Sequence, residues 1–350
     1  MATGPNVATM FHQQTSSGQI DAACIAADDV FHEFMHEHQI CAAALAVMKG
    51  ATVLVHRGYT HSTPGYPATQ PDSKFRLASV SKMLTCAALT RLVAMGRLTW
   101  ETPAFPFLNE GLPPLGPPAD VGMDTITVGE LLDHKAFLQH GIDNRAVGIT
   151  LNINHAPTLR NLVEYTYRDQ RLPRFLDPGA GFQIPREHYS NLGYAVLTAV
   201  VEKAAREDFV SFLHREVTSE VWQGRTLKSG ALPGEVSYDD PHTGLTQLIP
   251  GGDQMLPMAY GGGFILENSA GAGGLVSTAL AIARLGTRFA VWGRGGRSPG
   301  TSRSGDFSGT WAWAQSLANI DIAFMFNRSV ESRDEKEAFV RRLIATLPLA

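Results

Sequence analysis

The sequence has few cysteines, no long apolar run and no strong excess of charge. Its three cysteines, Cys24, Cys41 and Cys86, are too few and too scattered for a disulfide framework or a thiolate zinc site, which favours a reducing compartment. No stretch approaches the ~18 apolar residues of a membrane span, and residues 1–19 lack the basic and apolar regions of an export signal. We therefore expect a cytoplasmic protein with no membrane partner.

The charges are close to balanced. Lysine and arginine number 29 against 33 aspartates and glutamates, a formal net charge of −4, which leaves no basic footprint for nucleic acid. The chain has 350 residues, of which 44% are hydrophobic, so it is long enough for one large α/β domain or two lobes that fold on their own.

Strand-like segments lie at both ends of the chain, with helical segments between them. The sequence thus predicts an α/β (α+β) fold in which both termini build one sheet and a mostly helical domain is inserted. We expect a flexible segment over 1–18, a sheet domain over 19–80 plus 260–350, a helical domain with loops over 81–259, and a catalytic cleft between the domains. The expected elements are helices over 20–38, 79–95, 278–285 and 335–347, mainly helical segments within 127–216, and strands over 42–48, 51–55, 289–292, 310–315 and 320–326.

One candidate site is an H-E-x-x-H motif in the first predicted helix. His32 and His36 stand four residues apart and could share zinc, with Glu33 as the base of a metallopeptidase. A catalytic zinc site needs a third protein ligand, and the nearby sequence does not supply one. A polar helix end with exposed side chains explains the motif equally well.

A second candidate is an S-x-x-K motif, Ser79-Val80-Ser81-Lys82, at the start of the 79–95 helix. Residues three apart lie on one helix face, so the Lys82 amine can reach the Ser79 hydroxyl and assist nucleophilic attack. A backbone N–H at the helix N-terminus is available to stabilise an oxyanion. Taken alone, the pattern also fits an N-cap serine and a solvated lysine.

Two further segments that carry polar or glycine-rich motifs follow the S-x-x-K motif along the chain. They are Tyr189-Ser190-Asn191 and the glycine-rich run over 271–278, GAGGLVST. Together the three resemble the serine β-lactamase and penicillin-binding-protein superfamily, in particular its class C-like branch of esterases, D-amino-acid peptidases and transacylases. The resemblance covers residues 40–327 and implies an antiparallel sheet with flanking helices, as in the β-lactamase/transpeptidase fold.

The resemblance implies a role for each residue of these motifs. Ser79 is the acylated nucleophile, Lys82 takes or relays its proton, and Tyr189 is the partner base, whose pKa must fall well below ~10 for it to accept a proton. Asn191 holds an ester or amide oxygen of the substrate. No cofactor or metal is implied.

The third motif of the superfamily, normally K-T-G, H-x-G or W-G-G on an edge strand, matches Arg303-Ser304-Gly305 here. Arginine replaces the usual first residue, where it offers positive charge or binds a carboxylate. By the resemblance, the backbone N–H groups of Ser79 and Asp306 form the oxyanion hole. A surface arginine in a shifted loop is the alternative interpretation of Arg303.

All activities of this branch share an acyl-enzyme and differ in the acceptor. We expect an intracellular esterase or a biosynthetic transacylase that takes a small-molecule acyl donor and passes the acyl group to water, an amine or an alcohol. A β-lactamase or a D-amino-acid peptidase or amidase is the alternative within the superfamily. The zinc metallopeptidase and an inactive homologue that binds an acyl ligand are the alternatives of another class.

Overall fold

The computed structural model describes residues 13–62, 66–111, 113–138, 141–170, 189–226, 232–238, 242–245 and 255–349. Its main sheet has six strands in the order β1-β3-β2-β11-β10-β9, and each neighbouring pair is antiparallel. The strands are β1 (Gln13–Ile20), β2 (Ala42–Lys49), β3 (Thr52–Ser62), β9 (Ser302–Phe307), β10 (Thr310–Ser316) and β11 (Asp321–Phe326). Both ends of the chain therefore build one antiparallel sheet, as the sequence predicted.

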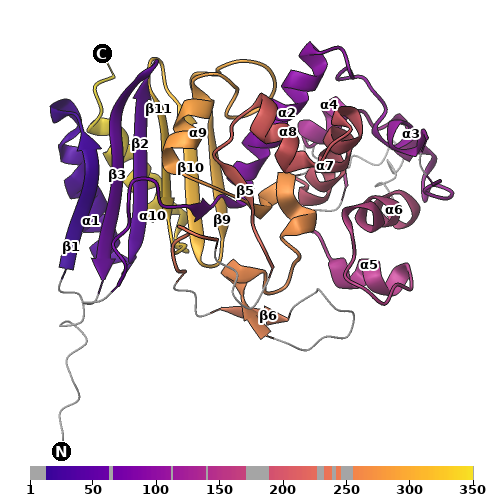
Figure 1. The fold of residues 1–350 in the computed structure, drawn as a ribbon, viewed down its shortest axis with the longest axis horizontal. Coiled ribbons are helices and arrows are strands. Elements are labelled where there is room, and N and C mark those ends of the chain that lie inside the picture. The colour runs from indigo at the N-terminus through magenta and orange to yellow at the C-terminus, as the bar shows by residue number, and fades with distance from the viewer. Residues whose placement is uncertain are drawn as a thin grey trace, which may run out of the picture.

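Helices cover both faces of this sheet, and a group of helices lies beside it (Figure 1). The helices at the sheet are α1 (Ala26–Glu37), α9 (Ala279–Gly286) and α10 (Arg333–Ala345). The helices beside it are α3 (Ala104–Asn109), α4 (Val128–Leu132), α5 (Asn144–Thr150), α6 (Leu159–Asp169), α7 (Asn191–Ala205) and α8 (Phe209–Glu216). The smaller elements include β4 (Phe75–Arg76), β5 (Val221–Gln223) and β8 (Leu275–Ser277), which form a three-stranded sheet, and the hairpin of β6 (Thr243–Leu245) and β7 (Met255–Pro257).

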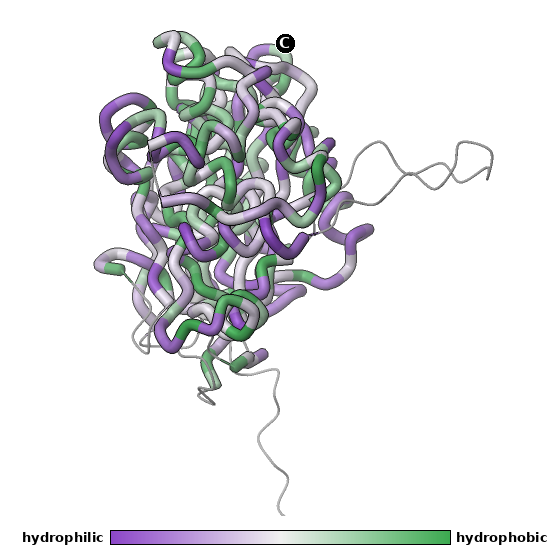
Figure 2. Tube along the Cα trace, turned by 90° about the vertical axis from the view of Figure 1, so that its right-hand side faces the viewer, coloured by the Kyte–Doolittle hydropathy of each residue, from purple (hydrophilic) through white to green (hydrophobic). Residues whose placement is uncertain are grey.

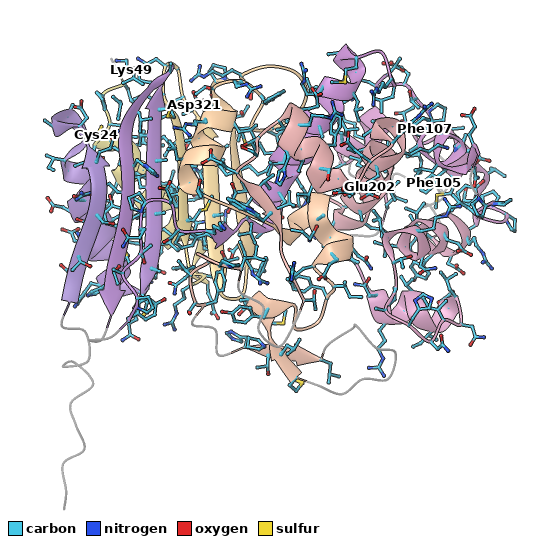
Figure 3. The ribbon with its side chains drawn as sticks, in the orientation of Figure 1. Cys24, Lys49, Phe105, Phe107, Glu202 and Asp321 are labelled. Carbon is cyan, nitrogen blue, oxygen red and sulfur yellow. The ribbon has the colours of Figure 1, made fainter. Side chains whose placement is uncertain are left out.

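Strand β2 is buried on both faces because its side chains alternate between two hydrophobic clusters. One cluster joins the sheet to α2 (Ser81–Ala94), α9 and the helical group, and the other joins it to α1 and α10. Figure 3 labels a member of each: Phe105 in the helical group and Cys24 beside the sheet. The β2 residues of the first cluster are Ala42, Ala44, Ala46 and Met48, and those of the second are Ala43, Leu45 and Val47.

Helix α2 lies in the centre of the molecule. Every side chain from Ser81 to Leu89 is buried. A helix that is apolar nearly all round is enclosed by its neighbours. The helix ends where predicted: Gly96 has φ +66°, and the Arg97 N–H donates to the Leu92 carbonyl, which closes the last turn. Lys82 therefore stands inside the core.

Three local predictions were wrong. Residues 13–18 do not belong to a flexible end, because β1 pairs with β3 along its whole length, and α1 begins at Ala26 rather than near residue 20. The segment 289–292 is not a strand: Gly293 and Gly295 adopt positive φ, and the Ala290 N–H donates to the Gly295 carbonyl, so the chain turns back there.

In the part of the chain that is described, no helix is long and apolar enough to cross a membrane. Figure 2 shows hydrophobic and hydrophilic residues interspersed along the trace.

Candidate active site

Ser79 lies in a single 3-10 turn, Ala78–Val80, that leads directly into α2. The residue before it, Ala78, has φ +44°, a left-handed conformation that costs a non-glycine residue roughly 1–2 kcal/mol. Packing holds the turn in place, since Gly273 abuts the Ala78 backbone and Gly305 of β9 abuts the backbone nitrogen of Ser79. The serine is thus fixed between a glycine-rich segment and the edge of the main sheet.

Lys82 follows one turn later and is fully buried. Its Nζ lies 3.1 Å from Ser79 Oγ, 2.6 Å from Asn191 Oδ1 and 2.6 Å from the Ala272 carbonyl oxygen. Burial, together with the positive charge of Arg303, holds the pKa of Lys82 well below its usual range. The site therefore disfavours the protonated amine more than water does.

The three contacts of Lys82 use the full hydrogen-bonding capacity of its nitrogen. A side-chain amide oxygen and a backbone carbonyl can only accept, so the bonds to Asn191 and Ala272 use both amine hydrogens. The third contact is with Ser79 Oγ, so Lys82 lies within proton-transfer distance of the Ser79 hydroxyl.

Tyr189 approaches Ser79 from the start of α7. Its hydroxyl donates to Ser79 Oγ over 2.7 Å. Burial raises the pKa of Tyr189, and the bond to Ser79 and the charge of Arg303 only partly oppose this. The role of Tyr189 as a base, expected from the sequence, requires a lowered pKa, and burial acts on Tyr189 in the opposite direction.

His134 supports Tyr189. The two rings stack with centroids 4.5 Å apart, and the backbone N–H of the adjacent Ser190 donates to His134 Nδ1 over 3.1 Å. Ser190 also caps α7, because its side chain accepts from the Gly193 N–H. These contacts fix the segment that carries Tyr189 and Asn191.

The candidate third motif, Arg303-Ser304-Gly305, lies on β9, the edge strand of the main sheet beside Ser79. Alternation along the strand turns Arg303 and Gly305 inward and leaves Ser304 and Asp306 exposed on the other face. Ser304 accepts a bond from Trp311 Nε1, and the Asp306 carboxylate pairs with Lys336, so neither side chain points at Ser79. Only their backbone is available to the site.

Arg303 is only 2% exposed and is not the surface arginine of the alternative interpretation. Its Nε donates to the Val291 carbonyl over 3.1 Å, and its guanidinium lies 4.0 Å from the ring centroid of Trp292. Sequence reasoning missed Trp292 because it read 289–292 as a strand, and it missed Ala272 because a carbonyl leaves no mark on the sequence.

A pocket of about 250 Å³ opens at the nucleophile. Its described lining combines Ser79 and Asn191 with Asp306 and apolar side chains. Most of the apolar lining was not foreseen, since apolar residues of loops carry no sequence signal. The apolar side chains are Ala78, Ile142, Phe264, Ala272 and Phe307.

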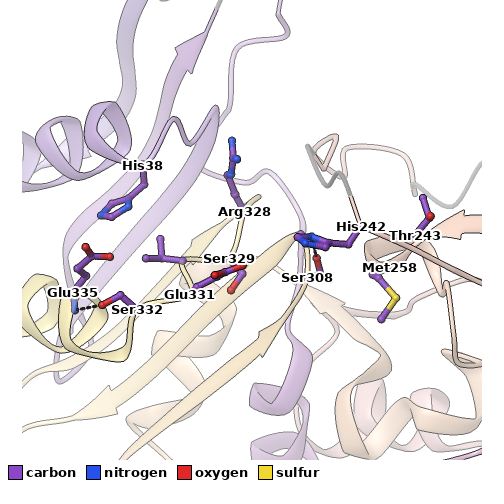
Figure 4. A pocket seen from close by; sticks show the side chains of 12 residues that line it. His38, His242, Thr243, Met258, Ser308, Arg328, Ser329, Glu331, Ser332 and Glu335 are labelled. Atoms are coloured by element: carbon purple, nitrogen blue, oxygen red, sulfur yellow. Dashed lines mark hydrogen bonds between the residues drawn. The ribbon is translucent and has the colours of Figure 1, made fainter.

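A larger pocket, of about 820 Å³, lies near the start of α10 (Figure 4). His38, Arg328 and Glu335 are among its lining residues, and Ser308 and His242 are joined across it by a 2.9 Å hydrogen bond. None of the site residues expected from the sequence is among its described lining residues. We therefore place the site in the smaller pocket.

The H-E-x-x-H motif lies across the sheet from α2. Glu33 pairs with Arg342 of α10, His32 packs edge-on against Tyr59, and His36 lies against His61. Within the described ranges, no group of three or more histidine, cysteine, aspartate or glutamate side chains is arranged to hold a metal ion. The motif therefore has no contact with the nucleophile.

The fold brings Ser79, Lys82 and Tyr189 together beside a pocket. The family model described as Beta-lactamase matches residues 27–316, and the chain belongs to this family. Among curated proteins, esterase EstB of Burkholderia gladioli is 34% identical over 193 residues, which cover 53% of this chain and 47% of that protein. The chain spans about half the length of the curated relatives it matches.

Solved structures of other proteins have the same fold as this chain. SurE in complex with D-Leu superposes with a TM-score of 0.64 at 21% identity, covering 93% of this chain and 78% of the other. A class C β-lactamase from Rhodobacter sphaeroides superposes with a TM-score of 0.61 at 14% identity, covering 91% and 98% of the two chains. At these identities the likeness shows the β-lactamase/transpeptidase fold alone.

Proposed function

We propose that the protein forms an acyl-enzyme on Ser79 from a small ester or amide and passes the acyl group to water, an amine or an alcohol. One observation carries the proposal: Ser79 Oγ lies 3.1 Å from Lys82 Nζ and 2.7 Å from the Tyr189 hydroxyl, at the mouth of a pocket. This is the hydrogen-bonded constellation that activates a weak nucleophile.

The proposed first step moves a proton from Ser79 to Lys82. As Oγ bonds to the acyl carbon, the lone pair of Lys82 accepts the hydroxyl proton and a tetrahedral oxyanion forms. Collapse of this intermediate expels an alkoxide, which takes the proton of Tyr189. The Lys82 ammonium returns a proton to Tyr189, so both groups regain their resting forms before the acceptor attacks.

We assign the oxyanion to the space between the Ala78–Val80 turn and β9. Backbone N–H groups of Ser79 and Asp306 fill this role in the proposal. It is supported by the close approach of Gly305 to the Ser79 nitrogen and by the position of Asp306 on the pocket wall. Donors on two rigid elements need no rearrangement as charge develops.

Esters are the favoured donors. An alkoxide leaves more readily than an amine, and the described pocket wall is largely apolar. The partial similarity to an esterase supports the same choice. Water as the acceptor makes the protein an esterase, and an amine or alcohol makes it a transacylase.

The test is turnover of p-nitrophenyl butyrate by wild type, Ser79→Ala and His36→Ala, each with and without a chelator. The proposal expects p-nitrophenol release by wild type and His36→Ala, unaffected by the chelator, and none above background from Ser79→Ala. Product analysis with an added amine or alcohol then separates hydrolysis from transfer. Chelator-sensitive turnover that survives Ser79→Ala would contradict the proposal and favour zinc chemistry.

A further inference from the structure

His134 stands at the end of α4, at a position that most often carries glycine. Two hydrogen bonds close the helix there. The His134 N–H donates to the Leu131 carbonyl over 3.3 Å, and the Lys135 N–H donates to the Glu130 carbonyl over 2.7 Å. The residue after the C-cap is left-handed in this arrangement, and His134 has φ +58°. A Cβ makes that conformation unfavourable, so a histidine kept there points to a function for its side chain.

The imidazole of His134 is buried among three aromatic rings. Its centroid lies 4.5 Å from that of Tyr189, 5.0 Å from that of Tyr194 and 5.9 Å from that of Trp292. Tyr194 is itself fixed, because its hydroxyl donates to the Leu132 carbonyl at the end of α4 over 2.9 Å. The position of the imidazole is therefore set by its neighbours.

One hydrogen bond defines the protonation of this imidazole. The Ser190 N–H donates to His134 Nδ1 over 3.1 Å, so Nδ1 carries no hydrogen and the ring proton is on Nε2. An imidazolium has a hydrogen on both nitrogens and cannot accept this bond. The contact thus selects the neutral ring in one of its two tautomers.

Ser190 lies between the two residues that join α7 to the nucleophile. The Tyr189 hydroxyl is 2.7 Å from Ser79 Oγ, and Asn191 Oδ1 is 2.6 Å from Lys82 Nζ. Because Ser190 is buried, losing the acceptor of its N–H is costly, and the backbone shifts to regain a partner. Such a shift displaces Tyr189 and Asn191 together.

From these contacts we infer that His134 is a positioning residue, whose neutral imidazole, protonated on Nε2, holds the 189–191 segment so that Tyr189 and Asn191 meet Ser79 and Lys82. His134 is not among the described lining residues of the pocket at Ser79, so it acts through this segment rather than on the substrate. The inference rests on the proposed function of Ser79.

Two substitutions separate the accepted hydrogen bond from the ring stacking. Asparagine places Oδ1 at the same number of bonds from the backbone as Nδ1, accepts hydrogen bonds and tolerates the left-handed conformation. Phenylalanine keeps an aromatic ring beside Tyr189 but has no acceptor. The inference therefore expects His134→Asn to retain most of the activity that His134→Phe loses.

The first experiment measures kcat and KM for p-nitrophenyl butyrate, with urea unfolding of each variant. His134→Phe is expected to lower kcat by about 10²-fold with a smaller change in KM, because a reacting group is misplaced by about 1 Å. Arg206→Asn is the matched control and is expected to keep wild-type kinetics. Arg206 is exposed and, with φ +61°, is left-handed at the end of α7, as His134 is at the end of α4.

A second experiment asks whether His134 acts through Tyr189. In the Tyr189→Phe background, His134→Phe is expected to lower kcat by a smaller factor than in wild type, because the hydroxyl that it misplaces is already absent. A residue that only stabilises the fold would lower kcat by the same factor in both backgrounds.

A third experiment reads the tautomer without any activity. NMR of the histidine ring nitrogens in wild type, with His134→Asn to assign the signal, is expected to show Nε2 protonated and Nδ1 bare. A proton on Nδ1, equal losses of kcat in His134→Asn and His134→Phe, or an unchanged factor in the Tyr189→Phe background would overturn the inference. A wild type that shows the expected tautomer but never acylates Ser79 would instead overturn the proposed function, so the two failures are distinguishable.

Discussion

Gly305 leaves no room for a side chain between β9 and the nucleophile. A Cβ built at this position lies 2.1 Å from the Leu77 carbonyl oxygen, 2.7 Å from the Val80 nitrogen and 2.9 Å from the Ser79 nitrogen. All three are backbone atoms and cannot rotate away. Gly305 does not adopt positive φ, so an alanine there is opposed by packing alone.

Gly305→Ala must therefore separate β9 from the turn that carries Ser79. Real Cβ atoms essentially never lie within 3.0 Å of such atoms, so the strand or the turn must move by about 1 Å. Overpacking of this kind costs about 1–3 kcal/mol of the free energy of unfolding. A displacement of about 1 Å at a reacting group lowers the rate by about 10²-fold.

The assay pairs urea unfolding with kcat/KM for p-nitrophenyl butyrate. Gly296→Ala is the matched control, because its Cβ meets only the Arg288 carbonyl at 3.8 Å, which is ordinary contact. Gly305→Ala is expected to lose more activity than its loss of stability explains. Gly296→Ala is expected to keep both its activity and its stability. Wild-type activity in Gly305→Ala would refute the placement of β9 against Ser79.

Three further substitutions test other contacts. Tyr189→Phe removes the donor to Ser79 and is expected to lower kcat/KM by about 10²–10⁴-fold with little change in unfolding, measured by steady-state kinetics and denaturation. Lys82→Met is expected to abolish turnover yet raise stability at pH 7 in urea titrations. In the unfolded chain Lys82 binds a proton that the buried side chain lacks, so wild type gains stability as pH rises toward about 10.4. The difference in stability between Lys82→Met and wild type therefore shrinks with rising pH. A difference that stays constant would contradict the lowered pKa of Lys82. Glu235→Gln removes the carboxylate that pairs with the fully buried Arg76 and is expected to cost about 3–5 kcal/mol of the free energy of unfolding. Unchanged unfolding would show that the pair is not buried.

The sequence predicted the sheet and the central helix because their signals are local. The apolar runs around Lys49-Gly50 define a hairpin, and Gly96 marks the end of α2. Strand β1 was missed because its residues are polar, as an edge strand tolerates, and its pairing with β3 is a tertiary contact.

Helical spacing alone predicted that Ser79 and Lys82 lie close together. The order of the motifs along the chain predicted that Tyr189 and Asn191 join them. The protonation of the resting site could not be predicted, because it depends on burial and on carbonyl oxygens such as that of Ala272. The inward turn of Arg303 was equally hidden, since it depends on the loop that carries Trp292.

The most direct test of the account is intact-mass spectrometry after a fluorophosphonate or a p-nitrophenyl ester, on wild type and Ser79→Ala, with and without a chelator. The account predicts one adduct on wild type, indifferent to the chelator, and none on Ser79→Ala. Absence of an adduct on folded wild type, or an equal adduct on Ser79→Ala, would contradict the claim that Ser79 is the nucleophile.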